Sequence, residues 1–394
     1  MPSVNPAILA WARETAGLTL EDAAKAIQLK AAKGQTGARR LEVLEQGESE
    51  PSRVQLRRMA EKYRRPLITF YLREPPAQGD RGEDFRRLPG QTAPHFDPQL
   101  DALIRSVRAR QSVVRSLLED EEAPPLSFVS SKAIGNGAGR VAESIADVIG
   151  FDLAEYRRQS GPGAAFSYLR DCLEGQGIFV LLIGDLGSHH SKIATAGFRG
   201  YAIADSIAPF IVINDNDAQA AWCFTALHEA AHLWLGQTGV SGTSHEARVE
   251  RFCNDVAGRL LLPISEIQEL NDLASQSFEQ CLARISQFAA DRNVSRRMVA
   301  YQLLHADVID GEAYRQLAER FTDDWRKSKA KDPDKTREGS GPNYYVVRRH
   351  RLGPALLHLA QRSVDGGVLS PTKAAQMLGV KPVSVRALLN PKPA

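Results

Sequence analysis

Apolar residues recur every three to four positions along most of the chain, which is the spacing of helices that bury one face. In the N-terminal part this spacing predicts a helix over residues 5–15 and a second one that begins after Thr19, at a sequence that resembles a capping box. Two further helices are expected over 38–45 and 54–63. Short helices separated by glycine-containing turns fit a helix-turn-helix unit, so we expect residues 1–76 to form one small helical domain.

A polar segment that contains prolines and glycines follows, and the helical spacing then resumes. We expect residues 77–126 to hold a linker and one long connecting helix over 101–120. Residues 130–176 have the spacing of two or more helices. These segments lead from the first domain into a larger one at residues 127–325.

Three apolar stretches within that larger domain have the short length and the β-branched composition of buried strands. They lie at residues 177–184, 198–205 and 209–214, and turn-forming residues separate the last two. A small sheet is therefore expected immediately before the next helical segment. The edge strand of such a sheet could pair with an extended peptide backbone.

Helical spacing returns after the sheet, over residues 278–290, 296–305 and 311–325. Residues 326–342 are charged and contain proline and glycine, as linkers do. Residues 343–394 then form a small basic unit with helical spacing. The pattern as a whole predicts an α+β fold that is mostly helical, with a small helical domain at each end.

Length and composition are those of an ordinary soluble protein. The chain has 394 residues, enough for two or three domains, of which 43% are hydrophobic and 25% charged. Its start lacks the pattern of a signal peptide, and its apolar runs are too short to span a bilayer, so we expect no membrane contact. The four cysteines form no Cys-x-x-Cys pair, which favours reduced core thiols in a cytoplasmic protein.

The net charge of +3 conceals an uneven distribution. Residues 1–76 carry 13 basic and 9 acidic side chains, residues 325–394 carry 14 and 4, and the centre, 77–324, therefore has a net charge of −11. Basic ends on an acidic centre indicate that any bound nucleic acid meets the ends, although such runs can also be solvated faces. Residues 369–389 have a second helix-turn-helix rhythm, which would serve nucleic-acid binding or the docking of a protein partner.

The strongest candidate chemistry is a His-Glu-x-x-His motif in an apolar, helix-favouring stretch. On a helix, His228 and His232 share one face and can present nitrogens to one metal ion, while Glu229 can act as the catalytic base toward a water. Zinc would need a third protein ligand, for which Glu250 is the best candidate. Asn254, one turn further on, is placed to hydrogen-bond a ligand histidine. The motif therefore predicts a Zn²⁺-dependent metalloendopeptidase.

Two points about this site are open at the level of sequence. A pair of surface histidines is the alternative to a metal site, but the apolar residues around the motif favour a buried helix. A further donor to the oxyanion could be Tyr201, His189, His190 or His245. A double histidine in a polar loop is more often merely solvated.

Two motifs of the N-terminal domain carry a resemblance to a known family. They are Leu-Thr-Leu-Glu-Asp-Ala-Ala at 18–24 and Leu-Glu-Gln-Gly-Glu-Ser-Glu-Pro-Ser at 44–52. With them the domain resembles the Xre (Cro/repressor-like) DNA-binding domain. The resemblance implies that Thr36, Arg39 and Arg40 open a recognition helix, where arginine can hold a phosphate or a guanine edge. It also implies double-stranded operator DNA as a partner and, because such domains bind paired half-sites, a homodimer. The turn before this helix, 31–37, is longer than usual.

The larger domain combines the metal motif with short segments on either side. These are Phe-Arg-Gly at 198–200, Ile-Val-Ile-Asn at 211–214, Phe-Thr-x-x-His-Glu-x-x-His at 224–232, Glu-x-x-Cys-Asn at 250–254 and Leu-Leu-Pro at 261–263. In this combination the domain resembles the ImmA/IrrE metallopeptidase family, which recurs behind Xre domains. The resemblance implies a gluzincin-type zinc site with two histidines and a glutamate as ligands and a separate catalytic glutamate. It also implies cleavage of repressors or antitoxin-like partners.

Two functions are compatible with these features. The first is a DNA-binding regulator whose zinc-dependent endopeptidase cleaves a repressor or partner protein in a phage, mobile-element, stress or toxin–antitoxin setting. The second is a non-catalytic regulator or antitoxin that binds operator DNA and a cognate toxin, with the zinc fold as a sensor or docking surface. The intact Glu229 discriminates between them, because its replacement should abolish cleavage only in the first case.

Overall fold

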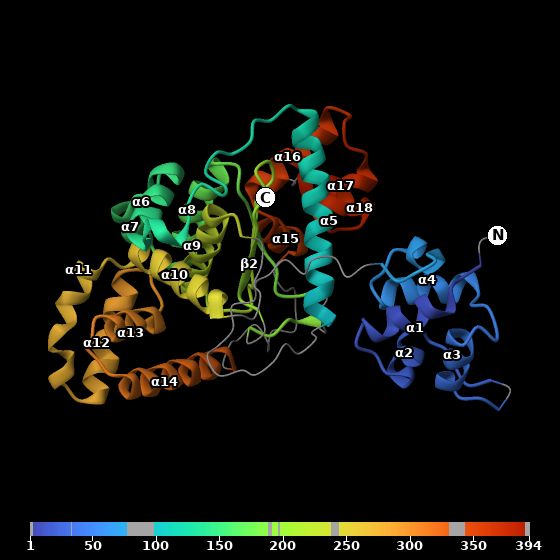
Figure 1. Cartoon of the computed structure of the whole chain (residues 1–394), viewed down its shortest axis with the longest axis horizontal. Helices are drawn as coiled ribbons and strands as arrows, with labels where there is room; N and C mark the ends of the chain where they lie inside the picture. Colours follow the sequence, from blue (N-terminus) through green and yellow to red (C-terminus); the bar gives the residue numbers. More distant parts are fainter. Residues whose placement is uncertain are drawn as a thin grey trace. The chain divides into compact units, whose positions relative to one another are not determined.

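A computed structural model describes residues 3–32, 34–76, 98–187, 191–195, 198–237, 244–330 and 343–390. The chain divides into two compact units, one of residues 1–81 with 91–105 and one of residues 82–90 with 106–394. The fold is mostly helical with one small three-stranded sheet, which agrees with the expected α+β class (Figure 1). None of the described helices is both long enough and apolar enough to span a membrane.

The first unit contains the four helices that the apolar spacing predicts, followed by a short 3-10 helix. They are α1 (Pro6–Glu14), α2 (Leu20–Ala26), α3 (Gly37–Glu45), α4 (Arg53–Lys62) and η1 (Leu67–Tyr71). Each of the four begins after a polar residue whose side-chain oxygen accepts a backbone N–H, namely Asn5, Thr19, Thr36 and Ser52. Their apolar faces meet in one core that includes Ile8, Leu9, Leu41, Leu44, Leu56, Met59 and Phe70.

The sheet of the second unit has three short strands of four residues each. They are β1 (Phe179–Leu182), β2 (Gly200–Ile203) and β3 (Phe210–Ile213), in the order β1-β3-β2. Strand β3 pairs in parallel with β1 and antiparallel with β2. Every residue of the three strands is buried, because both faces of the sheet are covered. The strands expected from the sequence are confirmed, each shortened at its ends.

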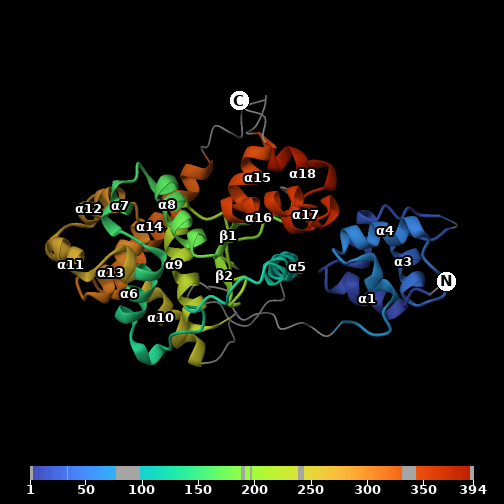
Figure 2. The ribbon, with the colours of Figure 1, turned by 90° about the horizontal axis from the view of Figure 1, so that it is seen from above.

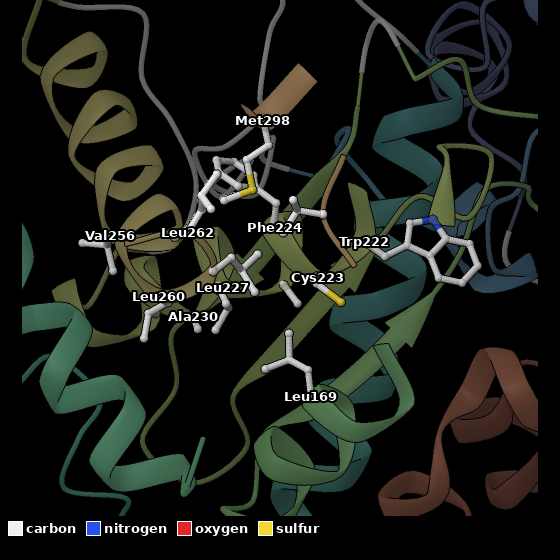
Figure 3. Packing of buried hydrophobic residues seen from close by; sticks show 14 of the residues in the cluster. Leu169, Trp222, Cys223, Phe224, Leu227, Ala230, Val256, Leu260, Leu262 and Met298 are labelled. Carbon is white, nitrogen blue, oxygen red and sulfur yellow. The ribbon is translucent and has the colours of Figure 1, made fainter. Parts of the chain in front are cut away.

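One face of the sheet is covered by α9 (Gln219–Leu235), which packs against β2 and β3. The elements around α9 on this side are η2 (Ile134–Asn136), α6 (Ala138–Ile149), α7 (Leu153–Arg158), α8 (Pro162–Gly175) and α10 (Ser244–Leu261). Figure 3 shows the core between them, where Leu169 of α8 lies with Leu227 of α9 and Leu260 of α10. Burial on every side explains why α9 is apolar almost all round.

Further helices extend this core beyond α10. They are α11 (Ile264–Ile267), η4 (Gln268–Ser275), α12 (Phe278–Asp291), α13 (Arg296–His305) and α14 (Gly311–Ala330). Buried residues from α12, α13 and α14, including Ile285, Val299 and Leu317, belong to the same apolar cluster as α9. The helical extension predicted from the sequence is therefore continuous with the core around the His-Glu-x-x-His helix.

Four helices complete the second unit: α15 (Tyr344–Leu352), α16 (Pro354–Asp365), α17 (Pro371–Leu378) and α18 (Pro382–Leu389). Helix α15 packs against β1, and α16 packs against α8 (Figure 2). The Arg351 side chain donates to Asp185 at 2.8 Å and to Asp215 at 2.6 Å. Because these two aspartates follow β1 and β3, the ion pairs fasten α15 to the ends of two neighbouring strands.

A buried ion pair on α8 provides a second attachment for the C-terminal helices. Arg170 Nε lies 3.0 Å from Glu174 Oε1, and both side chains are only 5% exposed. Arg170 also donates to the carbonyl oxygens of Val180 in β1 and His350 in α15, while Glu174 accepts the Ala355 backbone N–H at 2.8 Å. Burial lowers the pKa of Arg170 and raises that of Glu174, so each group depends on the other for its charged state.

The second half of α5 (Pro98–Asp120) also belongs to this unit and contacts the other side of the sheet. Gln111 donates to the carbonyl oxygen of Ala208 at 3.4 Å, and Arg115 pairs with Asp205. The Tyr201 side chain of β2 lies close enough to Arg108 and Arg110 of α5 to interact with them electrostatically. The sheet is thus enclosed between α9 on one face and the α5 segment on the other.

Candidate metal centre

Helix α9 positions the His-Glu-x-x-His motif inside the protein. His228 and Glu229 are 0% exposed and His232 is 1% exposed. The helix ends at Gly236, which has a left-handed conformation with φ of 67°. A Cβ atom there would lie 2.1 Å from the Ser130 hydroxyl, so this end of the helix requires glycine.

The two histidines point toward the same spot. Because they are four residues apart, they lie on one face of α9, and their Nε2 atoms are 3.2 Å apart. Glu250 approaches from α10, with Oε2 3.2 Å from His228 Nε2 and Oε1 3.1 Å from His232 Nε2. The donor atoms of all three residues lie within 4.8 Å of one another. The predicted ligands are therefore brought together by two different helices.

These separations fit a metal centre. Nitrogen and oxygen ligands about 2.0–2.2 Å from a tetrahedral ion are themselves roughly 3.3 Å apart. Burial raises the pKa of the Glu250 carboxyl, but His228 and His232 lower it more, so its pKa lies below the ordinary value. A carboxylate that remains ionised beside two imidazoles is a donor set that could hold a metal ion.

Asn254 supports one of these histidines from one turn further along α10. Its Oδ1 atom lies 3.1 Å from His228 Nδ1. With its proton on Nδ1, the imidazole donates to Asn254 and keeps the Nε2 lone pair directed at Glu250 and His232. The structure therefore brings Asn254 within hydrogen-bonding distance of His228, the histidine-to-asparagine contact that the sequence predicts.

Glu229 lies on the side of the site that faces the sheet. A Cβ atom on Gly200 of β2 would be 2.8 Å from Glu229 Oε1 and 2.5 Å from Thr225 Cγ2. Only glycine lets the strand approach α9 this closely. Gly200 is not among the site residues that the sequence predicts. The signal that could have revealed it is a glycine inside an otherwise bulky apolar strand.

Of the four candidate oxyanion donors, Tyr201 is the one whose side chain the structure describes. Successive strand residues point to opposite faces, so Tyr201 points away from Glu229, toward α5. Its hydroxyl is buried and lacks a hydrogen-bond partner among the described residues, and burial raises its pKa. Tyr201 is therefore excluded as a donor to the oxyanion. His189 and His190 lie outside the described residues, as does the side chain of His245.

The three residues expected to contact DNA open helix α3 of the first unit. The Thr36 hydroxyl accepts the Arg39 backbone N–H at 3.2 Å and so starts the helix. The exposed Arg39 side chain pairs with Glu42 at 2.6 Å, whereas Arg40 donates to the carbonyl oxygen of Lys30 at 2.6 Å. The longer turn before α3 contains a small bridge between Ala32 and Gln35. Arg39 is thus displayed on the surface, while Arg40 is tied to the preceding segment.

Comparison with known families gives one match. Residues 185–304 match the model of the IrrE N-terminal-like domain, Peptidase_M78. The match begins after β1 and contains β2, β3, α9 and α10, so it includes every residue of the His-His-Glu group. No curated protein and no solved structure gives a significant match to the chain. The match supports an ImmA/IrrE-type metallopeptidase domain in this part of the chain.

Proposed function

We propose that the chain is a DNA-binding regulator whose second unit is a zinc-dependent endopeptidase acting on a repressor or another partner protein. The observation that carries the enzymatic part is the meeting of the donor atoms of His228, His232 and Glu250 within 4.8 Å. The fully buried Glu229 directly follows His228 on the same helix. Two imidazoles and one carboxylate are the ligands of catalytic zinc sites, which keep a further position for water or substrate.

In this proposal each residue of the site has a separate role in peptide hydrolysis. His228, His232 and Glu250 hold the ion, and Asn254 fixes the orientation of His228. Zinc held there supplies Lewis acidity toward a water and the scissile carbonyl. The Glu229 carboxylate takes a proton from the attacking water and delivers it to the leaving amide nitrogen. Among the described strands β2 pairs on one edge only, so its other edge can align an extended substrate beside Glu229.

Metal analysis tests the site itself. The purified protein should contain about one zinc ion per chain. A chelator should lower its melting temperature, because the ion binds the folded state and not the unfolded one, and a free zinc concentration of about 100 times Kd stabilises the fold by about 2.7 kcal/mol. The measurement is elemental analysis combined with thermal unfolding before and after chelation.

The matched control uses another histidine. His232→Ala should lose the metal and the effect of the chelator, whereas His358→Ala, at an exposed position of α16, should keep both. Equal zinc contents in the His232→Ala variant and the wild type would contradict the proposed ligands.

The DNA-binding part of the proposal rests on the first unit. We propose that α3 enters the major groove of double-stranded operator DNA and that the protein binds paired half-sites as a homodimer. Support comes from the exposed Arg39 in the first turn of α3, the end of the helix at which the helix dipole favours phosphate. Arg40 contributes less to binding in this proposal, because its guanidinium is held by Lys30.

Replacing Arg39 tests this interface. Arg39→Ala is expected to weaken binding to the preferred operator by roughly 10- to 100-fold, as the loss of one base-reading arginine does. The operator is first selected from a pool of random duplexes, and affinities are then measured at one fixed salt concentration. Arg57→Ala on the exposed face of α4 is the charge-matched control. If the two variants bind alike, α3 does not read the operator.

A further inference from the structure

The basic side chains of the C-terminal helices fall into two classes. Residues 343–390 contain seven lysines and arginines and one acidic residue, Asp365. Four of the seven have hydrogen-bond or ion-pair partners within the fold. Arg348 donates to the carbonyl oxygens of Leu378 and Gly379, and Arg349 donates to that of Leu388. The other two are Arg351, paired with Asp185 and Asp215, and Arg362, paired with Glu121.

The other three cations are Lys373, Lys381 and Arg386. All three are exposed, and none has an ion pair or side-chain hydrogen bond within the described part of the chain. They lie on two consecutive helices, with Lys373 in the first turn of α17, Lys381 immediately before α18 and Arg386 within α18. The basic side chains of residues 343–390 that have no partner in the described part of the chain are therefore concentrated on α17 and α18.

The turn between these helices is tightly specified. Helix α17 ends at Gly379, in a left-handed conformation with φ of 60° and ψ of 40°, and Pro382 is the first residue of α18. Arg348 and Arg349 of α15 hold the carbonyl ends of α17 and α18, where positive charge is favourable. The inner faces are buried, through Ala374, Ala375, Met377, Leu378, Val385, Leu388 and Leu389. Two short helices joined by a glycine turn and braced by others form a helix-turn-helix arrangement.

The outer face of α18 carries an apolar side chain that the fold does not cover. Val383, one residue after the start of the helix, is 86% exposed and lies between Lys381 and Arg386 in sequence. In the major groove, small apolar side chains contact the thymine methyl group, while neighbouring cations meet guanine edges and phosphates. An exposed valine flanked by unpaired cations at the start of a second helix matches these requirements.

We propose that α17 and α18 form a second binding site for double-stranded DNA, separate from α3 of the first unit. Helix α18 enters the major groove with Val383 and Arg386 toward the bases. Lys373 and Lys381 contact phosphates on either side. Duplex DNA is favoured over a protein partner because the surface combines unpaired positive charge with the helix-turn-helix arrangement.

The salt dependence of DNA binding tests this proposal. The probe is a random-sequence duplex, and the full-length chain carries Arg39→Ala and Arg40→Ala so that the first unit contributes less. Adding Lys373→Ala or Lys381→Ala should reduce the slope of log Kobs against log salt by about 0.9 each. Combining them with Arg386→Ala should weaken binding at low salt by about tenfold or more. Arg140→Ala, at an exposed position of α6, is the charge-matched control and should change neither.

A second measurement separates the contribution of base contacts from the contribution of charge to DNA binding. Val383→Ser keeps the net charge, so it should leave the salt slope unchanged while altering the sequences that the chain selects from a random duplex pool. Thermal unfolding checks that each variant is folded, as we expect because all four side chains are exposed. Loss of binding in an unfolded variant is therefore distinguishable from loss of contact.

Two results would overturn the second DNA site. In the first, the triple lysine–arginine variant binds the duplex with the affinity and slope of its parent, so any DNA binding belongs to the first unit. In the second, the three cations are needed to bind polyglutamate but not duplex DNA, which assigns the surface to an acidic protein. Failure of the Arg39→Ala test leaves these outcomes unaffected, because the two sites lie on different units.

Discussion

Glu229→Gln is expected to lower kcat/KM for partner cleavage by about 10²–10⁴-fold, the contribution of a positioned proton carrier. Glutamine has nearly the same shape as glutamate but cannot accept the proton of the attacking water. It leaves His228, His232 and Glu250 in place, so the zinc content should equal that of the wild type. The combination of full metal occupancy and lost turnover is what assigns Glu229 to chemistry rather than to metal binding.

The measurement pairs wild type and variant against proteins encoded by neighbouring genes. Cleavage is followed by mass spectrometry of the products, and Glu143→Gln, at an exposed position of α6, serves as the control for loss of a carboxylate. A partner cut equally fast by the Glu229→Gln variant contradicts the proposed proton carrier. A partner held intact by both proteins, each with zinc bound, supports the alternative of a non-catalytic regulator or antitoxin.

Arg170→Met is expected to cost about 3–5 kcal/mol of the free energy of unfolding, because it leaves a buried charge without its partner. Glu174 is 5% exposed and would keep only the Ala355 N–H as a donor from the C-terminal helices. The substitution also removes the hydrogen bonds from Arg170 to Val180 and His350. Strand β1 and helix α15 would thus lose their shared attachment to α8.

Denaturant unfolding of the full chain measures this effect. The double variant Arg170→Met with Glu174→Leu should recover part of the loss, because it removes both charges together. Arg315→Met is the control at an exposed pair, since the Arg315 and Glu312 side chains are 65% and 54% exposed and solvent screens their attraction. If Arg170→Met proves no more destabilising than Arg315→Met, the pair does not hold the C-terminal helices.

Helix periodicity predicts which residues of the candidate metal centre share a face within each helix. His228 and His232 share a face of any α-helix, and so do Glu250 and Asn254. The sequence does not state that α10 crosses α9 where these two faces meet. That crossing depends on apolar packing between helices far apart in the chain, in which Val256 and Leu260 of α10 belong to the same cluster as Leu227 of α9.

The strands were predictable as apolar stretches, but their arrangement was not. Local composition does not indicate that β3 lies in the centre or that β1 joins it in parallel. The face of the sheet to which each side chain of β2 points likewise depends on the register of the strand. It places Gly200 against Glu229 and turns Tyr201 toward α5, which is why Tyr201 could not be excluded as a candidate donor from the sequence alone.

Charge was the least reliable guide. The positive charge of the C-terminal residues indicates a nucleic-acid surface if every cation is assumed to face solvent. Arg351 instead pairs with Asp185 and Asp215, whose proximity only the tertiary structure reveals. The sequence places these aspartates more than 130 residues before Arg351. Once the arginines that have partners within the fold are set aside, the cations of α17 and α18 remain.

Because both faces of the sheet are covered, not every fragment that contains the candidate metal centre is expected to fold. The segment that matches the IrrE N-terminal-like domain, 185–304, contains the whole His-His-Glu group but not β1, to which its central strand is hydrogen-bonded. It also lacks α6 and α8, which supply buried side chains around α9. Excised at those limits, the segment would expose a strand edge and an apolar core to water. The segment that matches the IrrE N-terminal-like domain is therefore smaller than the piece of this chain that we expect to fold around the His-His-Glu group.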